Sequence, residues 1–133
     1  MAGSDNMMMM MADQMEMKGS VRRIKSCAFD LISIGSELMD EDEFEDEADE
    51  FVFWDLIERE LRLKSTFLYC DFAKMISLVQ MNEQKNRLTL LGNRLFDSIE
   101  QVDNAVKTRN IELTQDRYSQ ALVVLRDVVA LMP

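Results

Sequence analysis

The sequence predicts an all-α protein folded as an antiparallel, up-down-up-down four-helix bundle. Breakers are scarce, with four glycines and a single proline at position 133, which leaves little room for a loop-rich or all-β fold. Apolar residues recur at steps of three and four in four segments joined by short connections, as amphipathic bundle helices require. A length of 133 residues with 47% hydrophobic and 30% charged residues is typical of one globular domain.

The N-terminal residues 1–12 are expected to form a flexible Met-rich arm, and residues 13–133 the bundle. An unbroken methionine run occupies positions 7–11. Methionine side chains adapt to irregular apolar surfaces, and chain termini are often poorly ordered until something holds them. Met8, Met9 and Met10 are therefore predicted to dock onto a protein partner.

The first helix is predicted over residues 13–38. Its apolar stripe comprises Val21, Ile24, Cys27, Ala28, Leu31, Ile34 and Leu38. The first half of this helix is basic, and Arg22 and Arg23 are predicted as a second docking contact.

Residues 39–50 are predicted to form an acidic loop, because nine of the eleven residues from 40 to 50 are Asp or Glu. Like charges at this density repel one another and favour a solvated segment. A calcium-binding EF-hand loop is excluded, since Glu45 stands where that loop needs glycine. Glu43, Glu45 and Glu47 are a third predicted contact, with a basic partner surface. Nucleic acid is excluded as a partner, because the net charge is −10 and phosphate binding needs an exposed basic surface.

The remaining helices are predicted over residues 51–79, 83–108 and 114–132. The apolar stripe of the first of these is wide, which predicts contact with more than one neighbouring helix. Asn82 and Thr114 are predicted to cap the last two helices. The residues predicted to be buried are Trp54, Leu61, Leu68, Leu91, Leu95, Ile99, Leu122 and Leu125.

The two cysteines, Cys27 and Cys70, are predicted to remain unbonded. If the end of the first helix and the start of the second are level, the cysteines are offset by about eight residues, or about 12 Å. A disulfide needs its two Cα atoms within about 7 Å.

The residue types that most enzymes and metal sites need are missing. The chain has no histidine, which excludes serine and cysteine triads, haem ligation and the usual zinc sites. No Cys-x-x-Cys pair or phosphate-binding glycine loop is present. The sequence therefore predicts a protein that is not an enzyme and needs no cofactor or metal. It also shows no apolar run of the roughly 20 residues that a membrane-spanning helix needs, and no signal peptide.

From Trp54 to the C-terminus the sequence resembles the PsbQ-like family, whose members are four-helix bundles of the thylakoid lumen. The resemblance rests on the string LRLKSTFLYCDF at residues 61–72 and on LFDSIEQVDNAVK at residues 95–107. Tyr118, Leu125 and Val128 extend it into the last helix.

The resemblance implies a lumenal protein, peripheral to the thylakoid membrane, that docks on protein subunits of a large membrane complex and has no small-molecule substrate. The founding type caps the oxygen-evolving complex of photosystem II through a Pro-rich N-terminal segment, whereas this N-terminus is rich in methionine. We therefore expect a subunit of the chloroplast NAD(P)H dehydrogenase-like complex, which serves cyclic electron flow around photosystem I. The alternatives are an extrinsic photosystem II subunit and a stand-alone carrier of a lipid or pigment.

Overall fold

The computed structural model describes residues 2–40 and 44–132, and these form four helices. Their bounds are α1 Ala2–Asp40, α2 Glu47–Leu78, α3 Asn82–Thr108 and α4 Ile111–Leu131. Within the described residues there is no strand, so the predicted all-α class is confirmed.

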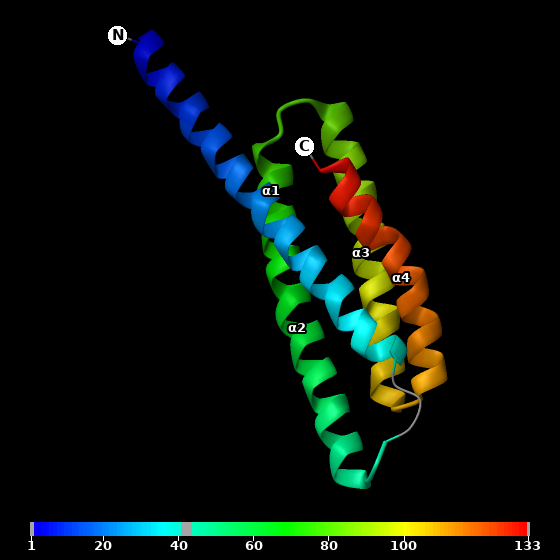
Figure 1. Ribbon diagram of the computed structural model, residues 1–133. Helices are drawn as coiled ribbons and strands as arrows, with labels where there is room; N and C mark the ends of the chain where they lie inside the picture. The colour runs from blue at the N-terminus through cyan, green and yellow to red at the C-terminus, as the bar shows by residue number, and fades with distance from the viewer. Residues whose placement is uncertain (1, 41–43, 133) are drawn as a thin grey trace.

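Each helix contacts its neighbours in the sequence, and α1 also contacts α4. The four helices therefore occupy the corners of a square in chain order, with the chain reversing direction at each turn in Figure 1. Two ion pairs join α1 to α2, Arg23 to Asp71 at 2.9 Å and Asp30 to Lys64 at 2.8 Å. A step of seven residues forward along α1 is thus a step of seven residues back along α2, as in an antiparallel pair.

The core fills the space between the helices. Seven of the eight residues predicted to be buried are buried, from Leu68 and Leu95 at 0% exposure to Leu61 at 8%. Leu122 is only half-buried, and Val124 is buried on α4 in addition to Leu125. The largest side chains with almost no exposure are Trp54, Phe72, Ile24, Leu38, Leu68, Met75, Leu95 and Leu125.

The ends of α1 and α2 differ from the prediction. The expected helix start at Asp13 is wrong, because α1 begins at Ala2 and includes the Met-rich segment. Methionine and alanine are strong helix formers, so this segment extends the helix. The acidic run also ends inside α2, whose first turn carries Glu47, Asp49 and Glu50 at the positive end of the helix dipole. Asp46 caps that turn by accepting a 2.8 Å hydrogen bond from the Asp49 amide.

The predicted caps of α3 and α4 are both wrong. Met81 precedes α3 and offers no side-chain cap, while Asn82 is already helical. Asn110 caps α4, because its side chain accepts a 3.1 Å hydrogen bond from the Leu113 amide. Thr114 lies within α4, fully buried, and its hydroxyl donates to the Asn110 carbonyl oxygen at 2.8 Å.

The register of α1 against α2 corrects the argument about the cysteines. The two ion pairs place Cys27 level with residue 67, so Cys70 lies three residues away rather than eight. Both residues are free thiols, with Cys27 buried and Cys70 exposed. Burial raises the pKa of the Cys27 thiol. The two thiols are kept apart because Cys27 faces the core and Cys70 faces solvent, and the offset of three residues along the helices contributes less.

The same register carries the N-terminal end of α1 past the last residue of α2. Leu78, the last residue of α2, is level with residue 16 of α1. Residues 2–15 therefore project beyond the bundle, as the blue end of the ribbon shows in Figure 1. We call this segment the overhang.

Tyr118 joins α4 to α1 at a glycine. Its hydroxyl lies 2.8 Å from the Leu31 carbonyl oxygen and 3.0 Å from that of Ile32, so it can donate its proton to either. The ring lies directly against Gly35, and a Cβ atom there would overlap the phenol. Gly35 thus lets an aromatic side chain reach the backbone of a neighbouring helix.

The buried phenol predicts a loss of stability at alkaline pH. Burial raises the pKa of Tyr118 to about 12, against about 10 for an unfolded tyrosine. The unfolded chain releases this proton first, so the contribution of Tyr118 is complete below about pH 10 and is lost by about pH 12. We expect a loss of about 2–3 kcal/mol across this interval. Urea unfolding at each pH measures it, and a Tyr118→Phe variant with the same slope would contradict the assignment.

Trp54 lies at the end of the bundle formed by the α1–α2 connection. Its ring packs against Phe53, at a centroid distance of 5.1 Å, and against Phe44 at 6.4 Å. Among the described residues, its indole nitrogen is the buried side-chain N or O atom that has no hydrogen-bond partner. Such a group costs about 1–3 kcal/mol, which the burial of the large ring offsets.

Candidate docking surfaces

The predicted docking residues of α1 lie on two different parts of the helix. Met8, Met9 and Met10 are exposed on the overhang, at 68%, 66% and 58%. Arg22 is exposed at the level of the bundle. Arg23 instead holds α1 to α2, because its guanidinium donates to Asp71 at 2.9 Å.

The predicted acidic contact lies at the opposite end of the bundle from the overhang. Glu45 and Glu47 are exposed there, at the start of α2, while Glu43 lies outside the described residues. The predicted residues therefore do not form one site. They mark separate surfaces along the length of the molecule (Figure 1).

The structure adds an exposed apolar stripe on α2. Val52, Leu56, Leu63 and Phe67 are 54%, 54%, 47% and 48% exposed. Their steps of four, seven and four residues place them along one side of the helix, roughly opposite the core-facing Leu61. Because neighbouring exposed apolar side chains on a soluble domain often mark a site of protein contact, we call these four residues the outer stripe.

Leu56, Leu63 and Phe67 were predicted to widen the apolar stripe of this helix. The predicted contact of this helix with more than one neighbour is confirmed, because α2 contacts both α1 and α3. Leu56, Leu63 and Phe67 are nevertheless exposed, so they take no part in the core. A helical wheel could have revealed the stripe, because Leu56 and Leu63 lie seven residues apart and far around the helix from Leu61 and Leu68.

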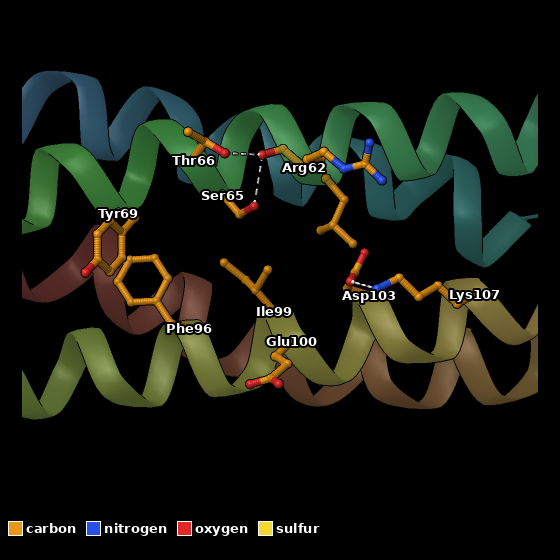
Figure 2. A pocket seen from close by; sticks show the side chains of 10 residues that line it. Arg62, Ser65, Thr66, Tyr69, Phe96, Ile99, Glu100, Asp103 and Lys107 are labelled. Atoms are coloured by element: carbon orange, nitrogen blue, oxygen red, sulfur yellow. Dashed lines mark hydrogen bonds and ion pairs between the residues drawn. The ribbon is translucent and has the colours of Figure 1, made fainter.

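A groove runs between α2 and α3, and Figure 2 shows the side chains that line it. Its volume is about 440 Å³. At one end, the rings of Tyr69 and Phe96 meet edge to face, with centroids 5.5 Å apart. Further along, Lys107 forms a 3.0 Å ion pair with Asp103.

The polar groups of this groove bond mostly to the protein itself. The hydroxyls of Ser65 and Thr66 donate to the Arg62 carbonyl oxygen at 3.1 Å and 2.8 Å. Such a groove offers shape and apolar surface to a partner.

No group of three or more metal-ligating Cys, Asp or Glu side chains gathers among the described residues. None of the described helices combines the length and the apolar character that crossing a bilayer demands.

The family model and the relatives that match this chain indicate the same family. The family model described as oxygen evolving enhancer protein 3, PsbQ, matches residues 6–133. The chain is 36% identical over 115 residues to the photosynthetic NDH subunit of lumenal location 3 of Arabidopsis thaliana, covering 86% of this chain and 47% of that protein. It is 30% identical over 77 residues to oxygen-evolving enhancer protein 3-1 of the same plant, covering 58% of this chain and 34% of the relative.

A spinach relative, oxygen-evolving enhancer protein 3 of Spinacia oleracea, is likewise 30% identical over 58% of this chain and 33% of its own length. The chain therefore spans between a third and a half of the length of these curated relatives. The family model covers almost all of the described residues and all four helices. The chain belongs to the PsbQ family.

Proposed function

We propose that this chain is a non-catalytic accessory subunit of the chloroplast NAD(P)H dehydrogenase-like complex, which it docks on and stabilises from the thylakoid lumen. One observation carries the proposal. Similarity to the lumenal NDH subunit extends over 86% of the chain at 36% identity, against 58% at 30% for the oxygen-evolving enhancer proteins. The antiparallel up-down-up-down topology proposed with it is supported by the ion pairs between α1 and α2 and by the path of the chain in Figure 1.

Adhesion is the mechanism that the surfaces support. The outer stripe and the methionines of the overhang offer apolar area to other subunits, and burial of such area drives association. Glu45, Glu47 and Arg22 add charges around them that select a partner of complementary charge. Binding only to the assembled complex stabilises that assembly by mass action, without any chemical step.

A role as an extrinsic photosystem II subunit is the second candidate. It is favoured by the family model itself, which is described as an oxygen evolving enhancer protein and matches residues 6–133. The two candidates predict different host complexes, which native gels of thylakoid membranes separate.

We expect that a plant lacking this protein accumulates several-fold less dehydrogenase-like complex and normal photosystem II, because the assembly loses a stabilising subunit. The measurement is complex abundance on native gels. Restoration with a variant carrying Leu56→Ser, Leu63→Ser and Phe67→Ser should fail, because the docking surface is then polar.

The matched control changes exposed apolar residues on other helices. Leu90→Ser with Val123→Ser alters side chains that are 65% and 58% exposed, and this variant should restore the complex. A plant that lacks the protein, keeps its dehydrogenase-like complex and loses photosystem II activity would support the second candidate instead.

A further inference from the structure

An apolar cavity lies at the end of the bundle from which the overhang projects. Its volume is about 300 Å³, and all four helices contribute to its lining. The apolar side chains around it are Met17, Met75, Val79, Leu88, Leu91 and Leu131. Ligand sites in proteins are mostly apolar hollows of about 300–1,000 Å³, so this cavity is large enough to hold part of a small amphiphile.

A basic hollow adjoins this cavity through a shared residue. Met17 also lines a hollow of about 440 Å³ on the surface of α1, together with Lys18, Val21, Arg22 and Lys25. No acidic side chain is among the residues that line it.

The three cations of this hollow, unlike most others among the described residues, form no ion pair. They lie four and three residues apart on α1, so they follow one side of the helix over about 10 Å. Arg23 and Lys64 are held in ion pairs with α2 and α1 respectively, whereas the ion pairs of the described residues include none of Lys18, Arg22 or Lys25. In a chain of net charge −10, three unpaired cations side by side favour an anionic ligand.

We propose that this end of the bundle binds one molecule of an anionic membrane lipid. An acyl chain enters the apolar cavity beside Met17 and Met75, and the anionic headgroup lies on Lys18, Arg22 and Lys25. The proposal is independent of which photosynthetic complex the protein joins.

The size and charge of the site select this class of ligand. An α-helix of a partner protein is about 10 Å across with its side chains, too wide for a cavity of about 300 Å³, whereas a hydrocarbon chain is narrow enough. A neutral lipid would leave the three cations unused, while a phosphate or sulfonate gains charge-assisted hydrogen bonds from them. Arg87 at the cavity rim is already paired with Glu83 at 2.8 Å.

The test uses dioctanoyl phosphatidylglycerol below its micelle concentration, added to the full 133-residue chain with ¹³C-labelled methionine methyl groups. Met17 and Met75 line the cavity, so we expect their NMR signals to shift and saturate. Met39, at the other end of α1, should not move. Dioctanoyl phosphatidylcholine should bind about tenfold more weakly or worse, because it lacks the net charge that the cations recognise.

Charge variants locate the headgroup. Lys18→Gln with Arg22→Gln and Lys25→Gln should remove the preference for phosphatidylglycerol while the fold, followed by circular dichroism, persists. The matched control makes the same change in charge elsewhere, with Lys74→Gln, Lys85→Gln and Arg126→Gln, and should keep the preference.

Three results would overturn the proposal. The first is that Met17 and Met75 signals stay fixed at saturating phosphatidylglycerol. The second is equal binding of the two lipids by the unaltered chain. The third is movement confined to the methionines of the overhang, which would mean nonspecific insertion into lipid with no cavity occupied.

Discussion

Replacing Leu95 with Ala is expected to lower the free energy of unfolding by about 2–5 kcal/mol. Leu95 has no exposed surface and lies in the main core cluster, on the face of α3 that carries Leu91 and Ile99. Removing most of its side chain withdraws buried apolar surface and leaves a cavity that four closely packed helices cannot fill. Urea denaturation followed by circular dichroism measures the difference.

The control for this prediction is the same substitution on the solvent side of the same helix. Leu90 is 65% exposed, so Leu90→Ala should change stability by no more than about 0.5 kcal/mol. Equal losses for the two variants would show that α3 does not present Leu95 to the core.

Adding one methyl group at Gly35 is expected to destabilise the protein by about 2–3 kcal/mol. The new Cβ atom would overlap the Tyr118 phenol, so the ring must retreat from α1. The retreat also breaks the hydrogen bond to the Leu31 or Ile32 carbonyl oxygen, worth about 1 kcal/mol. The greater helix propensity of alanine, about 1 kcal/mol, offsets only part of this loss.

Gly19 provides the matched control, because it is a second glycine of the same helix. A Cβ atom there would meet only the guanidinium end of the flexible Arg23 side chain, at 3.2 Å, and a shift of a few tenths of an ångström relieves that contact without separating Arg23 from Asp71. Gly19→Ala should therefore be neutral or stabilise by up to about 1 kcal/mol. In a double-mutant cycle, Tyr118→Leu should make Gly35→Ala much less costly, and strict additivity would refute the steric explanation.

The amino-acid sequence predicted the helices better than their ends or their register. The steps of three and four that place Trp54, Leu61 and Leu68 on one face depend on local periodicity, which a sequence shows directly. The start of α4 depends on whether Asn110 or Thr114 caps it, and both residue types are good caps. The register of α1 against α2, which the two ion pairs define, depends on packing between distant segments. The sequence does not show this register, so the offset of the cysteines was estimated wrongly.

The docking surfaces were harder to predict, because an exposed leucine and a buried one look the same in a sequence. Leu56 and Leu63 were counted with the apolar stripe of α2, although they lie far around the helix from Leu61 and face solvent. Arg23 was grouped with Arg22 as a docking contact, although the packing of α1 on α2 brings it to Asp71. The cavity beside Met17 arises where three other helices begin or end. Its lining residues come from separate parts of the sequence, so no single segment predicts it.

Trp54 gives the protein an intrinsic fluorophore at one end only. It is the single tryptophan. Its indole nitrogen is buried and has no protein acceptor among the described residues, so its emission is that of an apolar environment until the surrounding residues separate. The methionine methyl groups at the cavity report on the other end. Comparing the two signals during denaturation tests whether the bundle unfolds as one unit. Coincident transitions at both ends indicate cooperative, two-state unfolding.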